Sequence, residues 1–465
     1  MASTRTSETQ SQTAQKHKAH LPKNAKCGII CVERSKEMDY LPRIVDSILD
    51  LRLRAVGATV IVGPKWCGKT TTAKQKAKSI LEMQDPDLQE GYLKLAATKP
   101  SMLLEGANPR LIDEWQLAPV LWDAVRVSVD RRQEKGLYLL TGSVVVDEEK
   151  IRHTGIGRIS RLEMDTMSLW ESGESSGQVS LREVFADPSA PVDGAKGRLS
   201  VEELIFAVCR GGWPSSLAAR GDDAKLFVAR DYLSNIVESD ISRVDEVERD
   251  PVLAAQLLRS YARNVSTLAT TTSIRKDLMS VREVSMPTVD SYLSALRKLF
   301  VIGDIDAWCP AIRSATDIRA SKKRGFSDPS VAVAALGVGP EYFRKDFKTF
   351  GFLFESLVMR DLRVYSRELG GRLSYYRDRY GLEADAVLHL QDGRYALIEI
   401  KLGSNEIEEG AEHLKEVKRL ISEYNAVETQ CPLRLPDVLM VVTGGAQAYT
   451  RADGVHVVPI SALKQ

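Results

Sequence analysis

The sequence carries almost no net charge and has no long apolar run. Its 465 residues include 64 Lys and Arg against 63 Asp and Glu, a formal charge of +1. The overall basic bias that favours nucleic-acid binding is therefore missing, although a local basic patch is compatible with this balance. No run of 18 apolar residues occurs, so we predict no membrane-spanning helix and no membrane partner.

Cysteine is scarce as well. The six cysteines are scattered, and Cys27 and Cys31 form a C-x-x-x-C pair without a second Cys or His pair that would complete a zinc site. We interpret them as reduced thiols in a cytoplasmic protein. The first 20 residues are rich in Ser, Thr, Gln and Lys and lack the apolar centre of a secretory signal. We predict a disordered tail over 1–26.

What is present is typical of a globular protein with more than one core. Hydrophobic residues make up 43% and charged residues 27%, which supports substantial cores. A chain of this length is expected to form about two to four domains of ordinary size.

The most specific motif follows an apolar run over 58–62 and precedes a helix-compatible segment. This order of strand, G-x-x-x-x-G-K-T and helix indicates a phosphate-binding loop. Its glycines let backbone N–H groups turn toward phosphate oxygens, and the helix N-terminus favours an anion. Lys69 is predicted to reach the β- and γ-phosphates of ATP, and Thr70 to bind Mg²⁺. The predicted ATP-binding residues are Gly63, Pro64, Lys65, Trp66, Cys67, Gly68, Lys69, Thr70 and Thr71.

A second motif, Asp113-Glu114, ends the apolar stretch over 109–113. An acidic pair at a strand end can form the metal side of a nucleotide site. Asp113 is predicted to hold Mg²⁺, and Glu114 to act as the base that polarises the attacking water.

A third apolar stretch, over 137–141, ends in the hydroxyl residues Thr141 and Ser143. Either one is predicted to sense the γ-phosphate or to hold the lytic water, the alternative being an ordinary strand followed by a glycine turn. Together with 58–62 and 109–113, this stretch predicts alternating β and α elements. That order favours a parallel sheet with ligands at the carboxyl ends of its strands.

Two arginines in the segment that contains Gly155 and Gly157 are candidates for an arginine finger that neutralises transition-state charge. Arg158 is the first choice and Arg161 the second, and the alternative is that both are surface or salt-bridge arginines. Upstream, a helical stripe over 38–55 leads into the first strand. Its Arg43 is a candidate to approach the base or the phosphates, but we favour a position on a solvated helix face.

These motifs together resemble a prokaryotic family of AAA-like P-loop ATPases. The family implies ATP binding and hydrolysis, and a C-terminal domain similar to PD-(D/E)XK nucleases. The resemblance extends nearly to the C-terminus. Besides the phosphate loop, it rests on Leu111-Ile112-Asp113-Glu114-Trp115-Gln116, Leu140-Thr141-Gly142-Ser143, Gly157-Arg158 and Arg210-Gly211-Gly212-Trp213-Pro214.

Residues 170–200 are loop-like and are predicted to separate the first domain from a helical one. The clearest helix of that second domain is predicted over 285–301. With the preceding helical segments it resembles a winged-helix unit, whose recognition residues would be Thr288, Asp290 and Ser291. Few basic residues lie on that face, so a structural or self-association role is favoured.

The C-terminal part contains a second constellation of charged residues. Segments 385–390 and 394–401 are predicted to form a β-hairpin. A three-residue loop places Asp385 directly opposite Glu399, with Lys401 on the same face. A two-residue Asp-Gly turn would instead separate the two carboxylates.

This constellation suits metal-assisted phosphodiester hydrolysis. Glu355, on a helix predicted over 351–358, is expected to join Asp385 and Glu399 in binding Mg²⁺, and Lys401 to position the water. The order Glu355, Asp385, Glu399-x-Lys401 is similar to the PD-(D/E)XK pattern. The alternative is a degenerate relative that keeps the fold and uses Lys401 in a salt bridge. The basic run before it, Lys322-Lys323-Arg324-Gly325, is predicted to be a solvated linker, the alternative being a contact with phosphate.

The predicted fold class is α/β with three parts. These are an AAA-like P-loop parallel-sheet domain over 27–199, a helical winged-helix-like domain over 200–320, and an α/β PD-(D/E)XK nuclease-like domain over 325–465. The leading hypothesis is Mg²⁺-dependent ATP hydrolysis that drives a conformational switch controlling the C-terminal domain. The alternatives are an ATP-regulated, metal-dependent nuclease on DNA or RNA, and a non-enzymatic nucleotide-gated scaffold. Nucleic acid, another protein or a second copy of the chain are the partners considered besides ATP.

Overall fold

The computed structural model describes residues 40–142, 154–280, 283–311 and 320–465. Residues Leu41–Gln465 form one compact unit. The predicted tail over 1–26, the Cys27/Cys31 pair and Ser143 lie outside the described residues. In the part that is described, every helix is too short or too polar to span a bilayer.

The first sheet has five parallel strands in the order β2-β3-β4-β1-β5. The three predicted strands are confirmed as β1, β3 and β4, and so is their parallel arrangement. The strands are β1 (Ala58–Val62), β2 (Ser79–Glu82), β3 (Arg110–Asp113), β4 (Tyr138–Thr141) and β5 (Ile159–Glu163). Around them are α1 (Val45–Ala55), α2 (Lys69–Lys76), α3 (Gln89–Thr98), η1 (Pro100–Leu104), η2 (Trp115–Leu117) and α4 (Val120–Arg132).

Strand β1 is buried along its whole length because helices cover both faces of the sheet. Val60 packs in one core with Val125 of α4. Ile61, which points the other way, packs with Leu49 of α1 and Ala73 of α2.

The middle of the chain is helical. The predicted helix over 285–301 is confirmed as α12, and the Ser285 side chain caps it by accepting a bond from the Thr288 backbone. The winged-helix assignment stays a prediction. The elements are α6 (Val201–Arg210), α7 (Pro214–Ala218), α8 (Asp222–Asn235), the π-turn η4 (Ile236–Asp240), α9 (Ile241–Arg243), α10 (Pro251–Arg263), α11 (Thr271–Met279), α12 (Met286–Lys298), α14 (Pro329–Leu336) and α15 (Pro340–Phe343).

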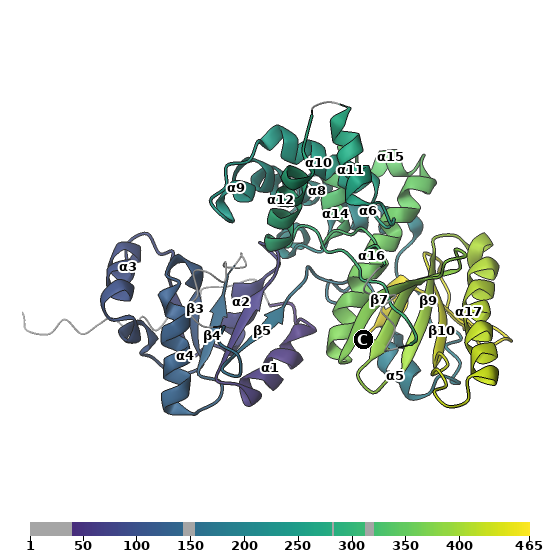
Figure 1. Cartoon of the computed structure of the whole chain (residues 1–465), viewed down its shortest axis with the longest axis horizontal. Helices are drawn as coiled ribbons and strands as arrows, with labels where there is room; N and C mark the ends of the chain where they lie inside the picture. Colours follow the sequence, from purple (N-terminus) through teal and green to yellow (C-terminus); the bar gives the residue numbers. More distant parts are fainter. Residues whose placement is uncertain (1–39, 143–153, 281–282, 312–319) are drawn as a thin grey trace, which may run out of the picture. The chain divides into compact units, whose positions relative to one another are not determined.

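The C-terminal part is a six-stranded mixed sheet in the order β11-β12-β10-β9-β8-β7. Helices α16 (Phe347–Glu368) and α17 (Ile407–Val427) flank it on opposite faces (Figure 1). Its strands are β7 (Gly371–Arg377), β8 (Glu383–Leu390), β9 (Tyr395–Lys401), β10 (Val438–Thr443), β11 (Tyr449–Thr450) and β12 (His456–Pro459), with the short turns η5 (Ser404–Glu406) and η6 (Ile460–Ala462).

The predicted hairpin register is confirmed. Ala386 pairs with Ile398 and Leu388 with Ala396, which is the register that the three-residue loop predicts. The loop closes with a bond of 2.8 Å from Leu390 N to Arg394 O. Gly393 has a φ of 88°, which is the left-handed geometry that the three-residue loop requires.

Residues 175–198 are not a simple linker at the end of the first domain. They contain β6 (Val179–Ser180), which pairs with β13 (Leu463–Lys464), and α5 (Leu181–Ala186). Gly197 N also donates to Ala446 O at 2.9 Å. The loop-like composition predicted a domain boundary here, but it did not predict the pairing with the C-terminal residues. A two-residue strand has too little alternation of apolar and polar residues to be recognised.

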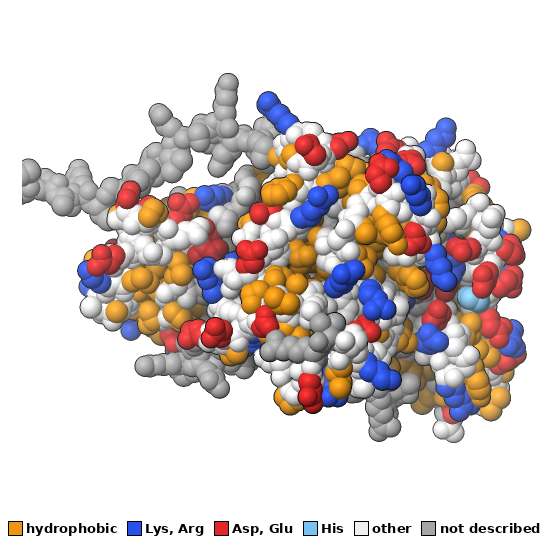
Figure 2. Space-filling view, turned by 90° about the horizontal axis from the view of Figure 1, so that it is seen from above, with side chains coloured by type: hydrophobic (Ala, Val, Ile, Leu, Met, Phe, Trp, Pro, Cys, Tyr) orange, Lys and Arg blue, Asp and Glu red, His pale blue; other side chains and the backbone are white. Residues whose placement is uncertain are grey.

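The charged surface is mixed in sign. Figure 2 shows Lys and Arg side chains interspersed with Asp and Glu on the face that it displays. This agrees with the near-zero net charge of the sequence.

Candidate nucleotide site and C-terminal acidic cluster

The carboxyl ends of three neighbouring strands meet at one edge of the first sheet. Strand β1 leads into the phosphate loop, β3 ends at Asp113, and β4 ends at Thr141, which lies opposite both Ile61 and Asp113. Parallel strands place their carboxyl ends together, so residues far apart in sequence share one site. The structure therefore brings Lys69, Thr70, Asp113, Glu114 and Thr141 to the same edge.

Two hydroxyl groups converge on the Asp113 carboxylate, which is only 3% exposed. Thr70 Oγ1 donates to Asp113 Oδ1 at 2.7 Å, and Thr141 Oγ1 donates to the same oxygen at 2.5 Å. Hydroxyl and carboxylate oxygens are the hard ligands that Mg²⁺ prefers, so Thr70 and Asp113 fit this ion. Thr141 orients Asp113 in this arrangement.

The Lys69 ammonium lies within its own loop. Its Nζ donates to Gly63 O at 3.0 Å and to Pro64 O at 2.7 Å, and the side chain is buried. Both acceptors are neutral carbonyls. A phosphate oxygen is a stronger, charge-assisted acceptor, so Lys69 is poised to exchange these carbonyls for an anion.

The loop geometry depends on its two glycines. Gly63 has a φ of 152°, and a side chain there would overlap the Met164 carbonyl. Gly68 has a φ of 103° and immediately precedes α2. Only glycine adopts these conformations without strain while leaving space for a ligand next to the backbone.

Glu114 follows β3 in a left-handed conformation with a φ of 53°. Gln116 Nε2 donates to its carboxylate. Burial raises the pKa of Glu114 above its ordinary value, and the neighbouring Asp113 charge adds to this effect. A carboxylate with a raised pKa accepts a proton more readily near neutral pH, as a general base must.

Arg43 binds the backbone of the phosphate loop, and it is buried, whereas a solvated position was predicted. It is 7% exposed. Its guanidinium donates to Cys67 O at 2.8 Å, to Asp165 O at 2.9 Å and to Glu171 Oε1 at 3.0 Å. The helical stripe could not reveal this role because Glu171 lies 128 residues further along the chain.

The other side of the loop is held by the helical part. Lys65 Nζ pairs with Asp240 Oδ1 of η4 at 2.6 Å. The Trp66 ring meets Tyr232 of α8 edge-on, with 5.7 Å between centroids. Neither Tyr232 nor Asp240 has a signal in the sequence that would have placed it at the nucleotide site.

The candidate arginine finger lies at the opposite end of β1. The Arg158 carbonyl accepts a bond from Ala58 N at 3.0 Å, and its Nε pairs with Asp130 at 2.7 Å. The length of β1, about 16 Å at 3.3 Å per residue, separates it from its own phosphate loop. The structure therefore does not bring Arg158 to this site, and a role toward another chain stays a prediction. Arg161 lies over the Phe300 ring at 5.8 Å.

In the C-terminal part, a lysine from a distant segment lies between two predicted metal ligands. Lys323 Nζ is 2.8 Å from Glu355 Oε1 and 3.3 Å from Asp385 Oδ1. It is 6% exposed, so the predicted solvated linker is wrong at this position. Burial acts to lower the pKa of Lys323, but the Glu355 and Asp385 charges outweigh it and raise that pKa.

Glu399 and Lys401 complete the acidic cluster, which comprises Glu355, Asp385, Glu399, Lys401 and Lys323. Lys401 Nζ pairs with Glu399 Oε2 at 2.8 Å, while Glu399 Oε1 is buried without a hydrogen-bond partner. Burial, together with the Asp385 charge, raises the pKa of Glu399 to about 8. The Asp385 carboxylate also accepts a bond from Ile400 N at 3.0 Å.

The predicted Mg²⁺ set of Glu355, Asp385 and Glu399 is not assembled for metal binding in this structure. Across residues 40–142, 154–280, 283–311 and 320–465, no group of three or more His, Cys, Asp or Glu is arranged to hold a metal ion. The physical reason is the Lys323 ammonium, which already neutralises two of the three carboxylates.

Lys323 is held in place by the helical part. Its backbone forms a reciprocal pair of bonds with Ile305, both at 2.9 Å. The next residue, Arg324, pairs with Asp304 Oδ2 at 3.2 Å and donates to Ala269 O at 2.7 Å. The position of the lysine therefore depends on the helical part as well as on the carboxylates.

A buried ionic network, which we call the junction network, joins the three parts of the chain. Arg360 of α16 pairs with Asp361 at 2.7 Å and with Asp328 at 3.1 Å. Asp361 accepts a bond from Leu169 N at 3.0 Å. Asp328 accepts bonds from Gly212 N and from Thr166 Oγ1, at 2.9 and 2.7 Å.

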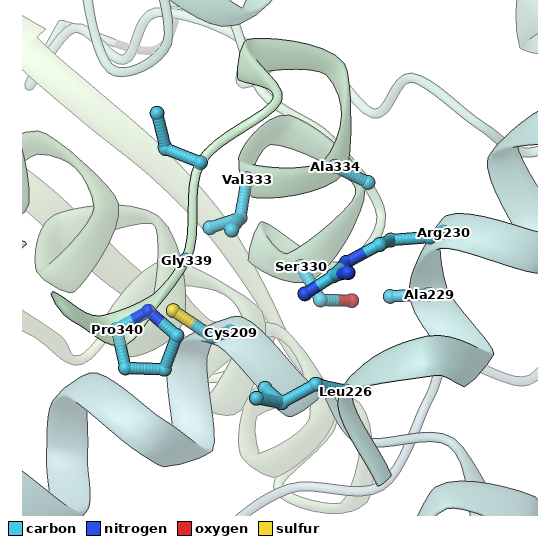
Figure 3. Close-up of a pocket in the computed structure, with 10 residues that line it drawn as sticks. Cys209, Leu226, Ala229, Arg230, Ser330, Val333, Ala334, Gly339 and Pro340 are labelled. Carbon is cyan, nitrogen blue, oxygen red and sulfur yellow. The ribbon is translucent and has the colours of Figure 1, made fainter. Parts of the chain in front are cut away.

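A small hollow in the helical part lies away from both sites (Figure 3). Arg230 and Ser330 are the charged and hydroxyl side chains in a mostly apolar lining. Burial raises the pKa of its Cys209 thiol to about 12. Because the hollow shares no residue with the phosphate loop or the acidic cluster, it is not part of either candidate site.

Three family matches together cover most of the chain. Residues 56–172 match a AAA domain, 201–342 match a domain of unknown function (DUF8612), and 350–463 match a domain of unknown function (DUF4143).

Two relatives have comparable length. The uncharacterized proteins Mb2031c of Mycobacterium bovis and Rv2008c of Mycobacterium tuberculosis are each 24% identical over 355 residues, covering 75% of this chain and 71% of theirs.

Likenesses to solved structures are weak. The Walker-type ATPase PABY2304 of Pyrococcus abyssi has a TM-score of 0.38 at 13% identity, covering 64% of this chain and 96% of that one. DnaA of Aquifex aeolicus bound to AMPPCP has a TM-score of 0.26 at 12% identity, covering 55% and 86%. Such scores carry no functional argument. The AAA match coincides with the phosphate loop and the Asp113 edge, so residues 56–172 of this chain are an AAA-like P-loop ATPase domain.

Proposed function

We propose that this protein hydrolyses ATP in a Mg²⁺-dependent manner and that nucleotide turnover controls its C-terminal domain. The main observation in support of hydrolysis is that the Thr70 and Thr141 hydroxyls both donate to the Asp113 carboxylate, next to Glu114. A loop that only holds phosphate does not need a carboxylate of raised pKa at the same edge.

The roles follow from position. Lys69 and the backbone of residues 63–71 bind the phosphates, Thr70 and Asp113 hold Mg²⁺, and Glu114 polarises water. Bound Mg²⁺ would supply neutralisation of phosphate charge. Thr141 keeps the Asp113 carboxylate oriented. Arg158 remains a candidate finger toward a second copy of the chain.

Control of the C-terminal domain is supported by contacts that leave the loop in two directions. Lys65 and Trp66 contact the helical part, which also holds Lys323 in the acidic cluster. Arg43 links the Cys67 carbonyl to Glu171, close to the 166–169 backbone that the junction network binds. A nucleotide that rearranges the loop would therefore strain contacts leading to α16, the helix that carries Glu355.

The alternatives differ in their support. An ATP-regulated, metal-dependent nuclease would need Glu355, Asp385 and Glu399 on a metal and Lys401 beside the water, and Lys323 opposes this arrangement. In a nucleotide-gated scaffold, the C-terminal domain binds a protein partner. This alternative agrees better with an acidic cluster whose carboxylates already pair with lysines of the same chain.

The test compares the full chain with Glu114→Gln and Lys69→Ala, using phosphate release for turnover and a labelled ATP analogue for binding. We expect Glu114→Gln to retain nucleotide while turnover falls by about 10²- to 10⁴-fold. Lys69→Ala is expected to weaken nucleotide binding by about 10- to 100-fold through loss of a charge-assisted contact. Lys76→Ala, on the same helix but paired with Asp50, is the matched control.

Unchanged turnover in both variants would refute hydrolysis at this site. Tight ATP binding with negligible turnover in the parent chain would favour the scaffold. Assays with single- and double-stranded DNA and RNA, with cleavage followed in the same tubes, separate these outcomes from the nuclease. Cleavage that requires Mg²⁺ or Mn²⁺ and is lost in Lys401→Ala would support the nuclease.

A further inference from the structure

The side chain of Gln116 returns to Glu114, the residue with which β3 connects to the next turn. Glu114 adopts a left-handed backbone conformation, and the short turn η2 follows it directly. Leu117 N donates to Glu114 O at 3.1 Å, so the chain reverses its direction within three residues. This reversal brings the Gln116 amide to the Glu114 side chain, and Gln116 Nε2 donates to the Glu114 carboxylate.

A buried aromatic side chain fixes the turn on the core of the first sheet. Trp115, which lies between the two polar residues, is 4% exposed, and its ring centroid is 5.0 Å from that of Trp122 in α4. The backbone of Glu114 and Gln116 is therefore well anchored. The Glu114 side chain has several rotatable bonds of its own, so its carboxylate needs a partner that holds it in one orientation.

The Gln116 amide is confined on its other side by the end of β4. Its Oε1 lies so close to Gly142, which follows Thr141, that a Cβ at this glycine would be 2.4 Å from it. The same oxygen is buried, and no residue in the described part of the chain donates to it. A buried amide oxygen without a donor is costly. The fold tolerates this cost in the arrangement that lets the other amide atom, Nε2, reach Glu114.

We propose that Gln116 is a positioning residue for ATP hydrolysis, whose amide, held between Gly142 and Glu114, fixes the Glu114 carboxylate in the orientation from which it polarises the attacking water. This role rests on the proposed hydrolysis at the same site. Gln116 acts through Glu114 and not through a contact with ATP. The absence of a side chain at Gly142 belongs to the arrangement, because a methyl group there would push the amide away from Glu114.

The test measures phosphate release and the binding of a labelled ATP analogue for the full chain and for Gln116→Leu, which keeps the size of the side chain and removes the amide. We expect turnover to fall by about 10- to 100-fold, because a misplaced general base works less well, while the affinity for the analogue is unchanged. Gln75→Leu is the matched control, because Gln75 is exposed on α2 and donates to the Thr71 carbonyl at 3.4 Å. Its turnover should equal that of the parent.

Two further comparisons distinguish positioning of Glu114 from a general loss of structure. In the Glu114→Gln background, Gln116→Leu should cause no additional loss of turnover, because the carboxylate that it positions is already gone. Gly142→Ala, whose methyl group displaces the amide, should lower turnover in the parent and cause no additional loss in Gln116→Leu.

Turnover that is lost in Glu114→Gln but normal in Gln116→Leu would overturn the positioning role and leave hydrolysis at this site supported. The role would also be overturned if Gln116→Leu lowered turnover by the same factor with and without the Glu114 carboxylate. Normal turnover in Glu114→Gln would contradict both the proposed hydrolysis by Glu114 and the positioning role that rests on it.

Discussion

The phosphate loop and the acidic cluster each contain a buried lysine, but the two lysines are held in different ways. Lys69 contacts the Gly63 and Pro64 carbonyls of its own loop. Lys323 comes from a distant segment and contacts the Glu355 and Asp385 carboxylates. The first ammonium has neutral, local partners, whereas the second has charged partners from two other elements.

The phosphate loop is therefore able to accept a ligand, whereas the acidic cluster is already neutralised by a lysine of the same chain. An anion can replace two neutral acceptors of Lys69 with a gain in electrostatic energy. A cation that displaces Lys323 must break a buried ion pair, and it leaves that ammonium without compensation unless the segment moves. Four measurements test whether the two lysines and their surroundings differ in this way.

The largest effect is expected for Lys323→Ala in the absence of metal. Removing the ammonium leaves two buried carboxylates uncompensated, which should lower the free energy of unfolding by about 3–5 kcal/mol. Lys69→Ala removes contacts to neutral carbonyls and should cost about 0.5–1.5 kcal/mol. Denaturant unfolding of the nucleotide-free chains in EDTA measures both. Equal losses of stability would show that the charged partners of Lys323 do not make it more important to the fold than Lys69.

The second-largest effect is expected for Arg43, which donates to a carbonyl of the phosphate loop. Arg43→Ala should destabilise the protein by about 3 kcal/mol, because Glu171 loses its cation in a buried site and the Cys67 carbonyl loses a donor. The free energy of unfolding in denaturant measures it. Arg54→Ala is the control, because Arg54 is an exposed arginine on α1, the helix that begins two residues after Arg43. A loss no larger than that of the control would show that Arg43 does not hold the loop.

A smaller effect tests the metal side of the nucleotide site. Asp113→Asn should remove most of the improvement that Mg²⁺ gives to ATP binding, about tenfold, because a neutral amide is a weaker ligand for Mg²⁺. Titration of a fluorescent ATP analogue with and without Mg²⁺ provides the measurement. Asp130→Asn, whose carboxylate pairs with Arg158 at the other end of the sheet, should leave the Mg²⁺ effect intact. A normal Mg²⁺ effect in Asp113→Asn would place the ion elsewhere.

The smallest effect is expected for Trp66→Ala. Loss of its edge-on contact with Tyr232 should lower the free energy of unfolding by about 0.5–1.5 kcal/mol. Phe227→Ala, which removes an exposed aromatic from α8, the helix that carries Tyr232, controls for loss of surface area. A change equal to that of the control would mean that the loop and α8 are not coupled through this pair.

Several features followed from the sequence because they depend on neighbouring residues. The strand, loop and helix over 58–76 are set by a short apolar run, two glycines and a lysine at fixed spacing. The hairpin register, with Ala386 opposite Ile398, is set by the length of the loop that ends at Gly393. In both places, backbone geometry leaves few alternatives.

Other features could not be predicted, because they depend on which distant charges the fold brings together. The helical stripe predicted that Arg43 lies on a solvated helix face, whereas the residue precedes α1, is buried and pairs with Glu171. Likewise, the basic run that contains Lys323 gave no sign of Glu355 or Asp385. Coulomb attraction acts over a few ångströms in space and is independent of separation along the chain.

Local sequence patterns predicted the phosphate loop, the parallel sheet that presents Asp113 and Thr141 at its edge, and a hairpin over 385–401. The cation that neutralises Glu355 and Asp385 is set by the tertiary structure. Lys69 remains among the neutral carbonyls of its own loop, whereas Lys323 is carried by the helical part into the acidic cluster. A buried carboxylate must find a cation somewhere in the fold, and the backbone path determines which one reaches it.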